Sequence, residues 1–111
     1  MSAATIDSAT FAQLQETAGA EFVAELVTTF LEEAPRMLAE LRSAQAAASA
    51  ERFRRAAHSL KSNSNTFGAL RLGEMAREQE LGGLSTDAAP LDALDTEYAR
   101  VAAALKALCN G

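Results

Sequence analysis

The sequence is poor in residues that interrupt helices or cross-link a chain. Its 111 residues include two prolines, six glycines, one cysteine and no tryptophan. A single cysteine excludes an intramolecular disulfide, and no run of about 18 apolar residues indicates a membrane-spanning helix. The first residues have neither the basic start nor the apolar stretch of a secretory signal. We therefore expect a cytoplasmic protein with no membrane insertion.

Several kinds of site are missing as well. The only histidine is His58 and the only cysteine is Cys109, so no pair of ligands has the spacing of a metal site. Gly82 and Gly83 are not followed by the Lys-Ser/Thr of a phosphate-binding loop, and no nucleophile elbow supports a hydrolase. The net charge of −5 argues against nucleic acid. We expect no metal, no cofactor of its own and no nucleic acid partner.

Apolar residues make up 49% of the chain and recur in steps of three and four, which predicts helices. The predicted helices span about 8–18, 20–47 with a bend near Pro35, 50–67, 69–81 and 89–108. Pro35 lacks an N–H group, so it should bend or divide the second helix. Short connections predict an all-α fold, an antiparallel up-and-down four-helix bundle with a short extra N-terminal helix. It should form a single domain over residues 1–111.

The periodicity also predicts which side chains face inward. The second helix should bury Phe22, Leu26, Phe30, Met37, Leu41, Ala44 and Ala48, in a stripe widened by Val23, Val27, Leu31 and Leu38. The last helix should bury Leu91, Leu94, Tyr98, Val101, Leu105 and Leu108. The fourth helix should bury Ala69, Leu72, Met75, Ala76 and, unexpectedly, the polar Gln79.

His58 lies in the middle of the helix predicted over residues 50–67. At about 100° per residue, the apolar side chains of that helix share one face and His58 lies on the opposite one. Arg54 and Arg55 precede it by one turn, and Lys61 follows it by one turn. A neutral imidazole is nucleophilic at cellular pH. A lone histidine on a helix is more often an ordinary surface residue, so its neighbours carry the argument.

Positive charge is concentrated around this helix. Residues 51–77 hold six cations and two carboxylates, a net charge of +4, so the rest of the chain carries −9. A basic surface on an acidic body favours an anionic partner and helps to orient the encounter. The alternative is that these charges only solvate a helix face.

His58 begins the run His58-Ser59-Leu60-Lys61, and Gly68 follows ten residues after the histidine. This stretch resembles the histidine phosphotransfer (HPt) domain family. Members of that family carry His-x-Leu/Ile-Lys-Gly and a further glycine about ten residues after the histidine. In helix order and length, the resemblance extends over essentially the whole chain.

The resemblance implies a role for each residue of the site. His58 would accept a phosphoryl group and exchange it with the aspartate of a receiver domain. Lys61 would neutralise the phosphoryl oxygens. Glu80, by its family position, would orient His58 by accepting a hydrogen bond from Nδ1–H, with Gln79 as the fallback partner. Gly68 would mark a kink or the end of the third helix.

A partner-binding surface is expected on the same face. Its predicted residues are Arg54, Arg55, Ser59, Ser62 and Asn65. Phe11 and Leu14 of the first helix, or Ala57, are candidates for an apolar grip, although core packing explains these three as readily. Two positions depart from the family pattern. Ser62 replaces a glycine and would affect the rate of transfer rather than transfer itself. Gln79 replaces a leucine, and a buried amide there would need hydrogen-bond partners.

The resemblance thus implies a covalent phosphocarrier of a two-component phosphorelay, not an enzyme. Its partners would be the receiver domain of a response regulator, which supplies Mg²⁺, and an upstream sensor histidine kinase. We expect a monomer. One alternative is a non-catalytic helical adaptor that binds signalling partners through the basic face. Another is the phosphate-accepting domain of a chemotaxis-type histidine kinase.

Overall fold

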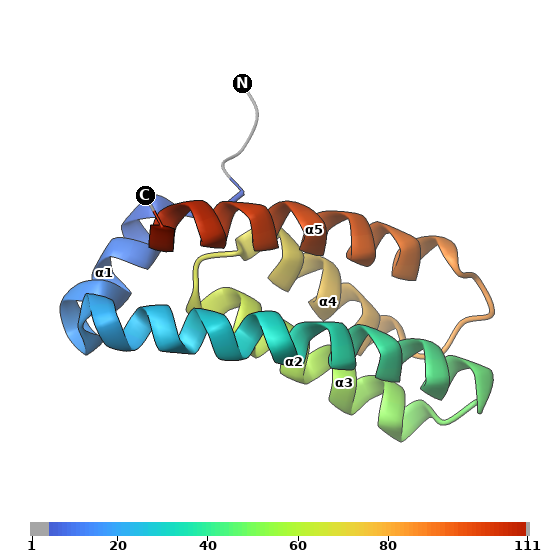
Figure 1. Cartoon of the computed structure of the whole chain (residues 1–111). Coiled ribbons are helices and arrows are strands. Elements are labelled where there is room, and N and C mark those ends of the chain that lie inside the picture. The colour runs from blue at the N-terminus through green and yellow to red at the C-terminus, as the bar shows by residue number, and fades with distance from the viewer. Residues whose placement is uncertain (1–4, 111) are drawn as a thin grey trace.

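The computed structural model describes residues 5–110, which form five α-helices and no strand (Figure 1). The helices are α1 (Ser8–Ala18), α2 (Ala20–Ala46), α3 (Ala50–Thr66), α4 (Leu70–Gly82) and α5 (Ala89–Asn110). Each begins and ends within two residues of its predicted bounds. The first four residues and Gly111, which the predicted domain included, lie outside the described part of the chain.

The four longer helices lie alongside one another, and Figure 1 shows consecutive helices from α2 to α5 running in opposite directions. Both α2 and α4 pack against α3 and α5. The short α1 packs across one end, against α2 and α3. Every one of the four longer helices therefore has two long neighbours, which is why each needs a wide apolar stripe.

The chain between α3 and α4 turns at Gly68. This residue has φ +84°, and a Cβ atom there would lie 2.9 Å from the carbonyl oxygen of Asp7. The backbone amide of Asp7 donates a hydrogen bond of 2.8 Å to the carbonyl of Gly68. The side chain of Asp7 accepts a hydrogen bond from the amide of Thr10. Gly68 is thus both the turn residue and the point where the start of α1 is fixed to the rest of the molecule.

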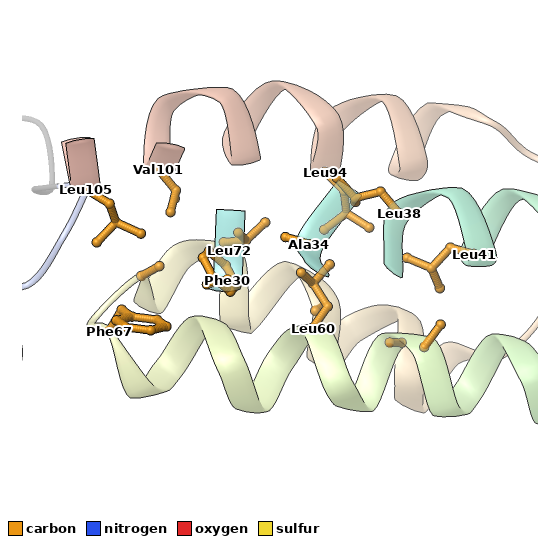
Figure 2. Close-up of a cluster of buried hydrophobic side chains, with 14 of the residues drawn as sticks. Phe30, Ala34, Leu38, Leu41, Leu60, Phe67, Leu72, Leu94, Val101 and Leu105 are labelled. Carbon is orange, nitrogen blue, oxygen red and sulfur yellow. The ribbon is translucent and has the colours of Figure 1, made fainter. Parts of the chain in front are cut away.

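The core runs along the centre of the four longer helices. Phe30 lies against Phe67 at a ring-centroid distance of 5.3 Å and against Tyr98 at 6.1 Å. Figure 2 shows Phe30, Leu60 and Leu72 from three different helices meeting in this core. Such aromatic contacts add about 0.5–1.5 kcal/mol to the stabilisation from burial alone.

Three residues of the predicted apolar stripes lie at the surface: Phe22, Leu108 and Ala48, of which Ala48 follows the end of α2 at Ala46. Phe22 is 52% exposed, because the buried side of α2 follows Val23, Val27 and Phe30 instead. Successive residues of a helix are rotated by about 100° about its axis, so when Val23 faces the core, Phe22 points toward solvent. Leu108 is 45% exposed, since Leu105 is the last residue of α5 that the core covers.

Pro35 does not divide α2, which runs unbroken from Ala20 to Ala46. A proline in a helix leaves the carbonyl four residues earlier, here that of Leu31, without its usual amide donor. The hydroxyl of Tyr98 on α5 donates a hydrogen bond of 3.2 Å to this carbonyl. A side chain from a neighbouring helix therefore satisfies the group that Pro35 leaves open.

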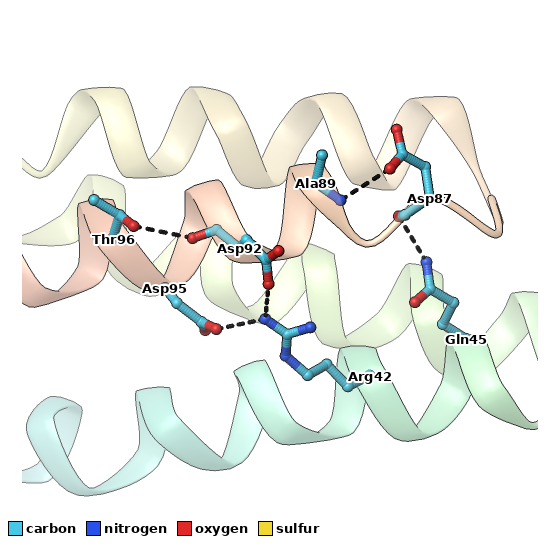
Figure 3. Close-up of polar contacts among 7 residues, drawn as sticks. All are labelled: Arg42, Gln45, Asp87, Ala89, Asp92, Asp95 and Thr96. Atoms are coloured by element: carbon cyan, nitrogen blue, oxygen red, sulfur yellow. Dashed lines mark hydrogen bonds and ion pairs between the residues drawn. The ribbon is translucent and has the colours of Figure 1, made fainter.

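Polar contacts hold α5 and its preceding loop to α2 (Figure 3). Arg42 on α2 pairs with both Asp92, at 2.7 Å, and Asp95, at 2.6 Å. Gln45, one turn later, donates to the backbone carbonyl of Asp87 at 3.1 Å. These bonds fix where α5 starts relative to the end of α2.

Candidate functional site

His58 projects from the middle of α3 into solvent. Its side chain is 54% exposed, whereas Ala57, just before it, and Leu60, two residues after it, are fully buried. The buried face of α3 is fixed in the core by Phe53 and Leu60, and this leaves the imidazole no room to turn inward. The ring is therefore reachable from outside the molecule.

Glu80 on α4 holds the imidazole. Its Oε2 lies 2.7 Å from His58 Nδ1, and its Oε1 lies 2.7 Å from the ammonium nitrogen of Lys61. The Glu80 side chain is only 12% exposed, so one nearly covered carboxylate joins the two α3 residues. Hydrogen bonds from Lys61 and then from His58 lower the pKa of the Glu80 carboxyl.

This pairing decides which ring nitrogen is free. An ionised carboxylate can only accept hydrogen bonds, so in the neutral ring Nδ1 must carry the proton that lies between it and Glu80. The other nitrogen, Nε2, then has an unshared electron pair. The arrangement presents a nucleophilic nitrogen on an exposed ring whose orientation is fixed.

Gln79 takes no part in this arrangement. It is half-buried, and the expectation that it lies in the core is wrong. The side of α4 facing α3 follows Gly73 and Ala76, and a further step of four residues reaches Glu80. Gln79 lies about 100° away from that line. It needs no buried hydrogen-bond partner, because it reaches solvent.

Gly73 is a site residue that the sequence did not single out. A Cβ atom at this position would lie 2.0 Å from Oδ1 of Asn65 on α3. The missing side chain thus lets the Asn65 amide lie against α4, at the edge of the predicted docking face rather than in its middle. A glycine within a helical pattern is the signal that could have indicated this close approach.

Arg54 and Arg55 are held by Glu51 rather than by the imidazole. Glu51 Oε1 lies 2.7 Å from Arg54 Nη2 and 3.0 Å from Arg55 Nε, all on the first turns of α3. The two hydrogen bonds lower the pKa of the Glu51 carboxyl, that from Arg54 more. Both arginine side chains stay more than half exposed, and Ser59 and Ser62, further along α3, are exposed as well.

The first helix does not supply the predicted apolar grip. Phe11 is 3% exposed and belongs to the core, because α1 packs across α2 and α3. Leu14 is half-buried and packs against the same core, and Ala57 is completely buried. Among the residues predicted to contact a partner, the exposed ones are therefore polar and charged side chains of α3.

Residues 5–110 contain no group of three or more histidine, cysteine, aspartate or glutamate side chains that could hold a metal ion. None of the described helices combines the length and the apolar character that crossing a bilayer requires.

Comparisons with known proteins point to one family. The sequence model of the Hpt domain matches residues 25–104. The structure is similar to the crystal structure of histidine-containing phosphotransfer protein B (HptB) from Pseudomonas aeruginosa PAO1. That match has a TM-score of 0.89 and 29% sequence identity, and it covers 98% of this chain and 97% of the other. No curated protein sequence matches.

Proposed function

The chain belongs to the Hpt domain family and acts in a phosphorelay, and from this premise we propose that His58 is the residue that carries the phosphoryl group. One observation supports this most strongly. The only histidine of the sequence is exposed, and its Nδ1 lies 2.7 Å from Glu80 while Nε2 is left to react.

The transfer step follows from that geometry. The electron pair of His58 Nε2 forms a bond to phosphorus as the bond between phosphorus and the receiver's aspartate oxygen breaks. That oxygen leaves with the bonding electrons as a carboxylate. Nδ1 keeps its proton, so the phosphorylated ring is positively charged and faces the anionic Glu80. Glu80 is a positioning residue in this proposal, because it acts through the ring and not on the phosphoryl group.

Lys61 is the cation that shares the Glu80 carboxylate with His58. Its ammonium group is already paired with Glu80 and is about three-quarters covered, one turn beyond His58. We expect it to neutralise part of the charge on the phosphoryl oxygens. The phosphoryl group would stand on a ring that is 54% exposed, where water screens such an attraction to about 0.2–1 kcal/mol, so the loss of Lys61 should slow transfer by no more than about fivefold.

The remaining predictions complete this picture. The four antiparallel helices α2–α5 would form an up-and-down bundle that presents His58, with α1 as a short addition. The chain would be a phosphocarrier that depends on a receiver domain for Mg²⁺ and on an upstream sensor histidine kinase for phosphate. A monomeric state, a cytoplasmic location and the absence of a nucleic acid partner stay predictions.

The decisive experiment incubates the chain with a receiver domain phosphorylated on its aspartate. We expect an acid-labile, base-stable phosphate that maps to His58 and is absent from His58→Gln. Asn63→Gln, an exposed amide change on the same helix, serves as the control and should be labelled normally. Label retained by His58→Gln would refute the assignment. Partner binding without any labelling would favour the adaptor, and labelling only by a separate ATP-binding kinase domain would favour the chemotaxis-type alternative.

A further inference from the structure

A groove of about 230 Å³ lies between α4 and α5. Two residues of α4 and four of α5 line it: Arg71, Met75, Ala93, Thr96, Glu97 and Arg100. Arg71 precedes Glu80 by nine residues, about two and a half helical turns, so the two side chains leave α4 on opposite sides. The groove is therefore a separate site from the carboxylate that holds His58.

A nearly covered carboxylate belongs to this lining. The Glu97 side chain is 6% exposed, and its Oε1 lies 3.7 Å from Arg71 Nε and 3.8 Å from Arg100 Nη1. A hydrogen bond between such charged groups is about 2.7–2.9 Å long, so neither contact is that close. A buried carboxylate needs hydrogen-bond donors to offset the loss of water, and these two guanidinium groups stop short of it. Glu97 is therefore open to a closer donor that enters the groove.

The two arginines can bind an anion at the same time. Their side chains are about two-thirds exposed, and the long contacts with Glu97 leave their N–H groups available. Both contacts end on the same oxygen, so the two guanidinium nitrogens are no further apart than the two distances together. A single small molecule can therefore reach both arginines with hydrogen bonds of ordinary length.

The charge and the size of the groove limit the kind of ligand. Two arginines and one glutamate give its lining a net charge of +1, on a chain whose total charge is −5. Met75, which is half-buried, and Ala93 add an apolar surface for a short carbon chain. Pockets for drug-sized ligands measure about 300–1,000 Å³, so this groove suits a smaller molecule.

We infer that this groove binds a free acidic amino acid, aspartate or glutamate. The ammonium group of the ligand donates a hydrogen bond to Glu97, and its two carboxylates accept hydrogen bonds from Arg71 and Arg100. The ligand's net charge of −1 complements the lining. A dicarboxylate without the ammonium group would leave Glu97 without its donor, and an amino acid with a neutral side chain would leave one arginine unpaired. The inference uses no residue of the His58 site, so it does not rest on the proposed function.

A nuclear magnetic resonance titration of the full chain tests the inference. The ligands are L-glutamate, L-aspartate, glutarate, which lacks the ammonium group, and L-glutamine, which lacks the second carboxylate. The ionic strength is held at about 0.1 M throughout, so that differences between ligands do not come from screening. We expect L-glutamate or L-aspartate to bind with a dissociation constant of about 1 mM and to shift the amide signals of Met75 and Glu97. Glutarate and L-glutamine should bind at least about tenfold more weakly.

Matched variants assign the contacts. Arg71→Gln should weaken the binding of the acidic amino acid about tenfold. Arg77→Gln is the control, because Arg77 is an exposed arginine of the same helix with an equally long contact, 3.8 Å to Glu74, and it does not line the groove. It should stay within about twofold of the parent, since it changes only the overall charge.

Glu97→Gln separates a contact with the ligand from a structural role. This variant should weaken the binding of the acidic amino acid about tenfold and leave glutarate bound no more weakly than by the parent, because only the ammonium group contacts Glu97. A melting curve of each variant shows that the fold is kept. The comparison of ligands on the parent chain needs no variant, so it stands even where a substitution unfolds the protein.

Three results would overturn the assignment. The first is the absence of saturable binding of both acidic amino acids at concentrations up to about 50 mM. The second is equal binding of glutarate and L-glutamate by the parent, and the third is an equal loss of binding in Arg71→Gln and Arg77→Gln. With no binding, a larger fall in melting temperature for Arg71→Gln than for Arg77→Gln would leave Glu97 and its two arginines as a structural link between α4 and α5. None of these results bears on the phosphorylation of His58, which is measured separately.

Discussion

The hydroxyl of Tyr98 should stabilise the protein only because Pro35 is present. Pro35 has no N–H, so the carbonyl of Leu31 lacks its helical donor, and Tyr98 supplies a hydrogen bond of 3.2 Å from α5. Burial raises the pKa of Tyr98, which keeps its hydroxyl protonated and able to donate at neutral pH. The bond therefore acts as a substitute for the missing backbone interaction.

Removing that hydroxyl by Tyr98→Phe should lower the free energy of unfolding by about 1 kcal/mol. The net value of a protein hydrogen bond is about 0.5–1.5 kcal/mol, and a half-buried carbonyl left without a partner moves the loss toward the upper part of that range. For a chain of this size, 1 kcal/mol corresponds to a fall in melting temperature of about 4 °C. The Tyr98→Phe variant keeps the aromatic ring at position 98 and its contact with Phe30.

The test is a double-mutant cycle with Pro35→Ala, measured by urea unfolding and circular dichroism. An alanine restores the amide that bonds to Leu31, so Tyr98→Phe should cost about 0.3 kcal/mol or less in that background. The m-value should be the same in all four proteins, since none of the changes alters the surface exposed on unfolding much. An equal loss in both backgrounds would refute the link between Pro35 and Tyr98.

Three further predictions follow from the turn, the site and the surface. Gly68→Ala should lower the free energy of unfolding by at least about 2 kcal/mol, because φ is +84° and a Cβ would crowd a backbone oxygen; an unchanged urea midpoint would contradict this. Hydrogen bonds from Lys61 and His58 lower the pKa of the Glu80 carboxyl. The stability that this ionised carboxyl contributes is therefore complete above its ordinary pKa of 4.5, and it is lost as the pH falls through the lower pKa of the folded state. The melting temperatures of the parent and Glu80→Gln should therefore converge in acid, and a constant difference down to about pH 2 would show that the depressed pKa does not stabilise the fold. Phe22→Ser should change the free energy of unfolding by less than about 0.5 kcal/mol, whereas a loss typical of a core phenylalanine would place this residue in the interior.

The family was predicted from the residues around His58, and the match to the Hpt domain confirms it. The all-α class was predicted from periodicity and is confirmed by five helices in the described residues. The signals for both are local. Each signal affects only residues close to it in the sequence. Examples are the helix cap at Asp7, the glycine between two helices at Gly68 and the apolar steps of three and four.

Which residue of α4 contacts the imidazole of His58, Glu80 or Gln79, does not depend on a local signal of this kind. Both residues are on one turn of α4, and a rotation of about 100° about the helix axis decides which of them meets the imidazole. That rotation is fixed by contacts between helices, which include the burial of Leu72 and Ala76 and the close approach of Asn65 to Gly73. Periodicity within α4 could not supply it, because the partner surface belongs to α3.

The prediction that Phe22 is buried was wrong, and the choice for Phe11 between the core and a partner grip stayed open, for a related reason. Sequence periodicity identifies an apolar side of a helix, but neighbours decide which part of that side is covered. The short α1 crosses two helices and buries Phe11, while Phe22 lies one residue outside the stripe that α3 and α5 cover. In the same way, the continuity of α2 through Pro35 depends on a hydroxyl that comes from α5.

By itself, the sequence determined the helices, their order and the outward direction of His58, because these depend on interactions within one helix or one turn. The tertiary structure alone showed that the α4 carboxylate expected from the resemblance to orient His58 also pairs with Lys61, and that Gln79 on the same turn does not take its place. The physical reason is that the axial rotation and spacing of packed helices are set by side chains distant in sequence, which no local pattern contains.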